Sequence, residues 1–419
     1  MIDYLKFLRD EYPLLGFGLS FTFFSSFGQT FLISLFVPYF LVEFALGNGE
    51  FGVLYAVATL GSALLLPWTG SWFDRIRLTR FSLAVVVLMA CSALLLAVSW
   101  SPLALFAGLL GLRLAGQGLS GHAAMGAMAR YYGPGRGKAL SISGLGFPLG
   151  EASLPLLVAG CIVWLGWRGS WVLVAVLAVL VFAPTLRLLL RRSGVELDPA
   201  RAEAKDGEPV GEWNPELRSW SRREVLRDSR FWLILPAALL PPFWTTGLFL
   251  YQTAIAGLKG WSIPLMASAF TAFAVTRFLL ALGTGNLVDR FSARQIYPFC
   301  VLPMAGSLAL LLGFQDAWTA FVFMAFLGVT AGMSGTVKPA VWAELYGIRH
   351  LGSIKSMMVA LMVLSTAVSP VLMGWVLDRG GDLDGILTWG IVSILVASFM
   401  AFRALGPATP EGLGPERFG

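Results

Sequence analysis

The sequence predicts an all-helical membrane protein with twelve transmembrane helices, arranged as two related halves of six. Three features predict this fold class: the composition, the length of the apolar runs and an internal repeat. The 419 residues are 57% hydrophobic and 13% charged, whereas a soluble protein typically carries about a quarter charged residues. So few charges cannot cover a globular surface, and we therefore expect most of the chain to face lipid.

Twelve apolar runs are long enough to cross a bilayer, which takes about 20 residues of helix. In the first half they lie near 14–42, 51–73, 80–100, 103–128, 139–164 and 169–189. In the second half they lie near 231–256, 262–287, 295–314, 317–342, 354–377 and 385–403. Abundant Gly, Ala and Ser, without period-two alternation, favour packed helices over barrel strands. The expected domains are a bundle over 1–190, a cytoplasmic linker over 191–229, and a bundle with a short cytoplasmic tail over 230–419.

The charged loops predict the orientation of the chain in the membrane. Basic residues concentrate in alternate loops, and the opposite loops carry only Arg168, Lys259 and Arg379. By the positive-inside rule, both termini and the linker are cytoplasmic, in what we expect to be a bacterial inner membrane. The net charge of +6 therefore reflects topology and not nucleic-acid binding. The three cysteines and two histidines have no metal-site spacing, so we expect neither a metal nor a cofactor.

The linker contains one local signal for ordered structure. Ser221-Arg222-Arg223-Glu224 has the spacing of a helix capping box and precedes the apolar pair Val225-Leu226. The spacing predicts a short interfacial helix that leads into the seventh span. An unstructured tether is the alternative.

The internal repeat involves the loop after spans two and eight. Gly70-Ser71-Trp72-Phe73-Asp74-Arg75 recurs, 215 positions later, as Gly285-Asn286-Leu287-Val288-Asp289-Arg290. A second pair, Gly118-Leu119-Ser120-Gly121 and Gly332-Met333-Ser334-Gly335, has nearly the same offset. Glycine allows two helices to approach closely, and an aspartate at a helix end can pair with arginines and with a neighbouring helix dipole. The chain therefore contains a duplicated unit of roughly 200 residues, as in many carriers.

The Gly-x-x-x-Asp-Arg loop resembles the signature loop of the major facilitator superfamily of secondary transporters. The resemblance covers essentially the whole chain and leaves the subfamily open. It implies two six-helix bundles related by a pseudo-twofold axis along the membrane normal. It also implies that the loop residues latch the cytoplasmic side in the outward-open state and do not bind substrate; these residues are Gly70, Asp74, Arg75, Gly285, Asp289 and Arg290.

Four ionisable residues lie well inside apolar runs: Arg113, Glu151, Arg277 and Lys338. A charge at mid-bilayer costs several kcal/mol, so each is expected to face a cavity or a partner. Neither Arg277 nor Lys338 has an acidic residue in its own run, and an anionic substrate is one hypothesis for the partner of each. For Lys338 the alternative is that the side chain snorkels to the headgroups.

Arg113 and Glu151 are the candidates for proton coupling. Arg113 begins a glycine-rich stretch that resembles the span-four motif of the superfamily, whose arginine is associated with coupling. Glu151 follows Gly144-x-Gly146-x-Pro148-x-Gly150, which partly resembles the span-five motif of antiporters. Glu151 is a counter-ion for Arg113, a titrating site or a water-facing group. Arg113 is either a structural partner or part of the substrate and coupling site.

Polar residues on spans one and seven give further candidate substrate contacts. Thr22, Ser26, Gln29 and Thr30 share one face of a helix, and Trp244/Tyr251 and Thr245/Gln252 are each seven apart. The resemblance implies that helices one, four, seven and ten line a central cavity. Gln29, Tyr251 and Gln252 are therefore expected to contact substrate, with helix–helix hydrogen bonding as the alternative. Trp244 stacks on a substrate or packs in the core.

We therefore expect a secondary transporter, not an enzyme, that moves a small organic anion such as a monocarboxylate with protons. The alternative is a proton-driven efflux antiporter for amphiphilic compounds. Monocarboxylate and oxalate–formate carriers are similar in type, since they also use an arginine in span eight, about one turn away from Arg277. The expected partners are the solute, protons and lipid, for a monomeric protein. The substrate, the transport direction and the choice of H⁺ or Na⁺ remain open.

Overall fold

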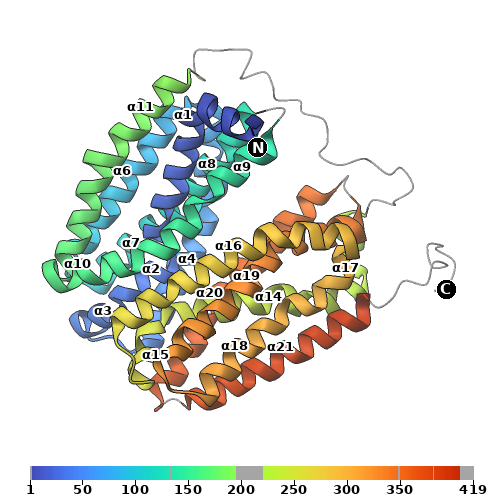
Figure 1. Ribbon diagram of the computed structural model, residues 1–419. Helices are drawn as coiled ribbons and strands as arrows, with labels where there is room; N and C mark the ends of the chain where they lie inside the picture. Colours follow the sequence, from blue (N-terminus) through green and yellow to red (C-terminus); the bar gives the residue numbers. More distant parts are fainter. Residues whose placement is uncertain (1, 133–134, 195–219, 348–349, 381, 406–419) are drawn as a thin grey trace. The chain divides into compact units, whose positions relative to one another are not determined.

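The computed structural model describes residues 2–132, 135–194, 220–347, 350–380 and 382–405. Every regular element in these ranges is a helix (Figure 1). The first half contains α1 (Ile2–Phe24), α2 (Thr30–Ile33), α3 (Val37–Phe44), α4 (Asn48–Gly70), α5 (Trp72–Arg75), α6 (Leu78–Ala97), α7 (Pro102–Leu112), α8 (Gly121–Tyr131), α9 (Arg136–Gly144), α10 (Gly146–Leu177) and α11 (Ala183–Ser193).

The second half contains α14 (Ser229–Leu250), α15 (Gln252–Leu258), α16 (Ile263–Phe291), α17 (Ala293–Ile296), α18 (Leu302–Gly313), α19 (Ala317–Tyr346), α20 (Leu351–Asp378) and α21 (Leu383–Leu405). Short helical turns connect several of them: η1 (Ser25–Gly28), η2 (Ser34–Phe36), η4 (Ala178–Phe182) and η5 (Tyr297–Val301). A π-helical segment, η3 (Arg113–Ser120), joins α7 to α8 into one continuous span.

The described residues contain ten helices that are long and apolar enough to cross a membrane, or eleven if the bent pair Phe7–Gly28 and Thr30–Phe44 is one span. One of these, Arg136–Ser193, contains Gly166 at φ 70° and ψ 170°, which is not helical. Only glycine adopts such a backbone without strain, so this helix is two spans that meet at Gly166. Counting them separately raises the eleven spans to twelve.

The linker helix is present. α13 (Arg222–Arg227) begins at Ser221, whose backbone N–H donates to Glu224 Oε2 at 2.8 Å. The backbone N–H of Glu224 donates in return to Ser221 Oγ at 3.4 Å. These two bonds form the capping box that the sequence predicts. Val225 is fully buried, so this helix packs on its neighbours and is not a loose tether.

The chain forms two compact units that do not follow chain order. The first combines Met1–Glu212 with Thr246–Ala274 and Ala367–Gly381, and the second combines Trp213–Thr245 with Val275–Thr366 and Asp382–Gly419. The first unit thus includes the end of α14, all of α15 and the end of α20. The sequence-based division into 1–190, 191–229 and 230–419 remains a prediction.

Candidate functional site

In the first unit, α4 begins in a cluster of polar contacts with α20. Asp378 Oδ1 accepts hydrogen bonds from the Asn48 backbone N–H at 2.8 Å and from Asn48 Nδ2 at 2.9 Å. Asp378 Oδ2 accepts from the Gly49 backbone N–H at 2.7 Å. The first N–H groups of a helix have no partner within the helix, and a negative charge is favourable there. Asp378 therefore satisfies and stabilises the start of α4. We call Asn48, Gly49, Tyr251 and Asp378 the α4 N-terminal cluster.

Tyr251, one of the candidate substrate contacts, belongs to this cluster. Its hydroxyl lies 2.8 Å from the carbonyl oxygens of both Asn48 and Pro370. The helices pass so closely here that a Cβ on Gly52 would lie 2.4 Å from the Pro370 carbonyl oxygen. A Cβ on Gly374 would lie 2.4 Å from the Tyr251 hydroxyl. Glycine at these two positions is what allows α4 and α20 to touch.

Gln252, the next candidate, lies against span one. Its Nε2 donates to the Phe31 carbonyl at 2.9 Å and also contacts Ser34 Oγ. The side chain is fully buried, and its Oε1 has no hydrogen-bond partner among the described residues. Both Tyr251 and Gln252 therefore make helix–helix hydrogen bonds, the alternative that the sequence left open.

Arg113 is buried, at 2% exposure, at the start of the π-helical segment. Its Nη1 donates to the Tyr55 hydroxyl at 2.5 Å, and it lies 3.4 Å from Thr30 Oγ1 and from the Gly28 carbonyl oxygen. Its Nε has no acceptor among the described residues. The pairing with Glu151 that the sequence suggested is not among these contacts. The acceptors that the described residues offer to this buried positive charge are thus all uncharged.

The glycines near Arg113 explain how it reaches span one. A Cβ on Gly28 would lie 2.4 Å from the Leu112 carbonyl oxygen, and one on Gly116 would lie 2.7 Å from the Gly28 Cα. Small residues let two backbones touch in this way. Gln29 lies at the break that follows Gly28, with an extended backbone at φ −87° and ψ 150°, and is half-buried.

Glu151 is buried, at 8% exposure, where α10 crosses span one. A Cβ on the neighbouring Gly150 would lie 2.1 Å from Ser26 Oγ, and one on Gly146 would lie 2.1 Å from Thr22 Oγ1. Thr22 also donates to the Ser143 carbonyl at 2.5 Å. The polar face of span one therefore lies against α9 and α10, next to the candidate proton site.

The first copy of the repeated loop lies at the other end of α4. Asp74 forms an ion pair with Arg130, whose Nη1 donates to the Phe73 carbonyl at 3.1 Å. Gly70 is buried beside His122, and Arg75 is exposed. In the second copy, Gly285 has open space around it and Arg290 is exposed. The side chain of Asp289 lies outside the described part of the chain.

Trp244 lies in an aromatic cluster of the second unit. It is fully buried, with its ring centroid 5.2 Å from that of Trp389 and 5.4 Å from that of Phe243. This arrangement matches the core-packing alternative. Arg277 lies half-buried on α16, where a Cβ on Gly332 of α19 would lie 2.5 Å from its carbonyl oxygen.

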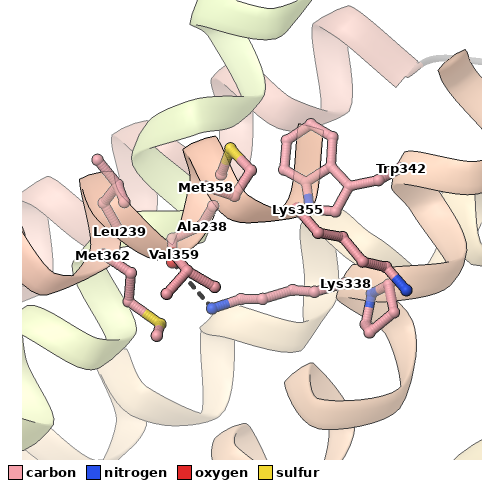
Figure 2. A pocket seen from close by; sticks show the side chains of 9 residues that line it. Ala238, Leu239, Lys338, Trp342, Lys355, Met358, Val359 and Met362 are labelled. Carbon is pink, nitrogen blue, oxygen red and sulfur yellow. Dashed lines mark hydrogen bonds between the residues drawn. The ribbon is translucent and has the colours of Figure 1, made fainter. Parts of the chain in front are cut away.

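Lys338 lines a pocket of about 250 Å³ in the second unit. Its Nζ donates to the Ala238 carbonyl at 2.8 Å (Figure 2), so the side chain points into the protein and not to the headgroups. Lys355 extends in the opposite direction along the pocket (Figure 2). The remaining lining residues are apolar: Ala238, Leu239, Pro339, Trp342, Met358, Val359 and Met362. None of the described residues that line the pocket is acidic.

Several of these residues have no local sequence signal. Tyr55 contacts Arg113, 58 positions away, and Asp378 contacts Asn48, 330 positions away. Helical periodicity predicts only contacts between residues a few positions apart. Lys355 and Trp342 lie near the ends of their apolar runs, where a lysine or tryptophan commonly marks the membrane interface. Spacing does offer one clue, because Trp342 follows Lys338 by four positions and therefore shares its helix face.

The chain matches a known protein family and is similar to solved structures. The model of a family described as the Major Facilitator Superfamily matches residues 19–269 and 243–418. No curated protein sequence matches the chain. Among solved structures, the chain is similar to a bacterial homologue of the human lysosomal transporter Spinster, in an inward-facing and unoccupied conformation. The TM-score is 0.68 and the identity 16%, over 94% of this chain and 96% of that chain.

The nucleoside transporter NupG is also similar, with a TM-score of 0.70 and 12% identity over 95% of this chain and 99% of that chain. At such low identities the likeness shows the fold alone. Together with the family match, it confirms the helical membrane fold that the sequence predicts.

Proposed function

Since the chain belongs to the major facilitator superfamily, we propose that it carries a small organic anion, such as a monocarboxylate, across the membrane together with protons. Alternating access would expose the binding site to each side in turn. The membrane-spanning helices and the transporter family favour transport as the function, and not catalysis.

The pocket around Lys338 is the observation that carries the proposal. The ammonium of Lys338 is half-buried, and its one described hydrogen-bond partner is the backbone carbonyl of Ala238. Its charge therefore has no compensating carboxylate among the described residues. Burying such a charge is costly unless a partner is supplied. Arg113, whose acceptors in the described part of the chain are all uncharged, is a second buried positive charge, in the first unit. A negatively charged substrate would supply the missing partner.

Glu151 is the proposed proton site. It is a buried carboxyl group on a helix that crosses span one at Gly150, with no room for a side chain there. A carboxyl group that is dry in one conformation and wet in another exchanges its proton as the conformation changes. Arg277 is the proposed alternative to Lys338 for holding a substrate carboxylate, since its forked donors suit one.

The experiment is uptake of radiolabelled acids into proteoliposomes with an imposed pH gradient. A proton-coupled anion carrier accumulates a monocarboxylate against its gradient when the outside is more acidic than the inside. Protein-free liposomes measure the passive entry of the neutral acid, which is subtracted. The proposal would be ruled out if uptake does not depend on the pH gradient and does not saturate with the concentration of any acid tested.

The apolar walls of the pocket favour a second candidate, an efflux antiporter for amphiphilic compounds. Trp342, Met358 and Met362 would accept a hydrophobic compound, since methionine adapts its shape and tryptophan offers a flat apolar face. A panel of dyes and lipophilic cations in the same preparation separates the two candidates.

We also propose the orientation that the loop charges predict. Both termini and the linker would be cytoplasmic, in a bacterial inner membrane, and the protein would act as a monomer. Protease access to the 191–229 linker in sealed vesicles of known orientation tests the topology.

A further inference from the structure

We infer that the Lys338 pocket binds an amphipathic acid of about six to eight carbons, with its carboxylate on Lys338 and its hydrocarbon chain along the apolar walls. This inference rests on the proposed function, since it narrows the class of organic anion. It adds a size, an orientation and the residues that set them.

The headgroup position follows from the hydrogen bonds of Lys338. An ammonium has three N–H donors, and one of them is given to the Ala238 carbonyl at 2.8 Å. Two donors remain, and no other acceptor for them exists among the described residues. Because the ammonium is fixed on one side by that carbonyl (Figure 2), a carboxylate oxygen can take the open side. The bond would be charge-assisted and partly shielded from water, which makes it stronger than a surface pair.

The hydrocarbon chain has a matching surface. Trp342 is 3% exposed and Met358 is 8% exposed, so these walls are fixed in the protein. Val359 and Met362 are 52% and 37% exposed and form the open side through which a ligand would enter. A carboxylate without an alkyl chain would leave all four surfaces uncovered. A chain laid against them removes apolar surface from water on both partners.

The pocket volume sets the length of the chain. An apolar cavity of about 150 Å³ binds benzene, which has six non-hydrogen atoms. By proportion, a cavity of about 250 Å³ holds on the order of ten non-hydrogen atoms. A carboxylate and five to seven methylene or methyl groups fill that space. Shorter acids leave part of it empty, and longer chains extend past Val359 and Met362 into the surroundings.

Lys355 gives the pocket a second positive charge at a more exposed position. Its side chain runs in the opposite direction from Lys338 (Figure 2). An exposed charge attracts anions from a distance but is screened by salt. We therefore expect Lys355 to raise the rate of acid binding at low ionic strength, and Lys338 to hold the bound carboxylate.

The test is equilibrium binding of straight-chain carboxylates, from acetate to dodecanoate, to the purified full-length protein in detergent. Each added methylene should tighten binding about fourfold, up to roughly octanoate. Beyond that length, the affinity should level off. Equal affinity for acetate and octanoate, or a rise that continues unbroken to dodecanoate, would overturn the inference.

Substitutions identify the pocket as the site. Lys338→Met keeps most of the length of the side chain and removes the charge, and should weaken octanoate binding about 10- to 100-fold. Lys138→Met, at an exposed lysine of the first unit, is the matched control and should leave binding unchanged. Octanoate brominated on its chain should quench fluorescence in wild type and quench less in Trp342→Phe. Unchanged octanoate affinity in Lys338→Met, or equal quenching in Trp342→Phe, would count against the site.

The experiments distinguish three outcomes: the pocket binds lipid, the pocket is not the substrate site, or the protein does not carry organic acids. If an anionic phospholipid displaces octanoate and neither its chain length nor Lys338 matters, the pocket is a lipid site and the inference fails. If short acids are carried with protons but Lys338→Met binds and carries them normally, the proposed function stands and only the pocket assignment fails. If no acid of any length binds or is carried, the proposed function fails as well.

Discussion

Asp378, the last residue of α20, accepts hydrogen bonds from the backbone and side-chain nitrogens of Asn48, the first residue of α4, at 2.8 and 2.9 Å. At the other end of the same span, Asp74 pairs with Arg130. One transmembrane helix is thus held by a carboxylate at each end. The first carboxylate comes from a distant part of the chain, whereas the second comes from the turn that follows the helix. Contacts of the first kind must break if α4 and α20 separate during transport.

Replacing Asp378 with alanine should loosen the α4 N-terminal cluster. Loss of a helix-capping side chain typically costs 0.5–2 kcal/mol, which shifts an equilibrium between closed and open forms by roughly 2- to 30-fold. The measurement uses Ala256→Cys in a cysteine-free background, at a site on α15 that is 1% exposed. An impermeant maleimide should label this cysteine faster when Asp378 is replaced by alanine.

Two variants serve as controls for this experiment. Asp378→Asn keeps one acceptor oxygen and should label at an intermediate rate. Asp384→Asn changes an exposed aspartate at the start of α21 and should label like wild type. If Asp378→Ala is labelled as slowly as wild type, the α4 N-terminal cluster does not hold this end of α4 closed.

Gly52→Ala should block the close contact of α4 with α20. The added Cβ would lie 2.4 Å from the Pro370 carbonyl oxygen and 2.8 Å from the Tyr251 hydroxyl, so the helices must move apart. We expect transport to fall at least tenfold while the protein remains folded. Gly160→Ala on α10, where a Cβ meets nothing within 4 Å, should transport normally. Equal uptake by the two variants would mean that the contact is not needed in the transport cycle.

Tyr55→Phe should destabilise the surroundings of Arg113. The variant removes the 2.5 Å acceptor of a buried guanidinium while it keeps the aromatic ring. Hydrogen bonds to charged groups contribute about 1.5–3 kcal/mol, so the melting temperature should fall clearly. Tyr12→Phe, at an exposed tyrosine, is the control. If stability is unchanged but proton stoichiometry changes, Arg113 acts in coupling and its contact with Tyr55 is not structural.

Asp74→Asn should alter the conformational cycle and leave substrate affinity within a few-fold. Asp74 lies at the end of a span and pairs with Arg130, which also holds the Phe73 carbonyl. Exchange between conformations, followed by single-molecule distance measurements, should change its rate or its balance. A large loss of affinity with unaltered exchange would contradict the latch role.

The sequence predicts the spans well because lipid imposes a length and an apolar composition on each of them. The capping box at Ser221 follows from an equally local rule. For Lys338 the sequence left two positions open, and only the hydrogen bond to the Ala238 carbonyl shows where the ammonium lies. The break in span one at Gln29 and the π-helical segment at Arg113 are not visible in the apolar pattern, which continues across both. The partners of Arg113, Tyr251 and Gln252 could not be predicted, because side chains far apart in the chain meet only through the packing of whole helices. Sequence spacing placed Tyr251 and Gln252 on polar faces, but only the structure shows that those faces contact α4 and span one.

The most direct test of the central claim is the external pH of weakly buffered proteoliposomes when an organic acid salt is added outside. We predict that wild-type vesicles alkalinise the medium beyond protein-free liposomes, because protons enter with the anion. Glu151→Gln should lose that excess while it still exchanges labelled acid for unlabelled acid. Acidification of the medium, or an excess alkalinisation that Glu151→Gln retains in full, would contradict proton-coupled anion transport through this site.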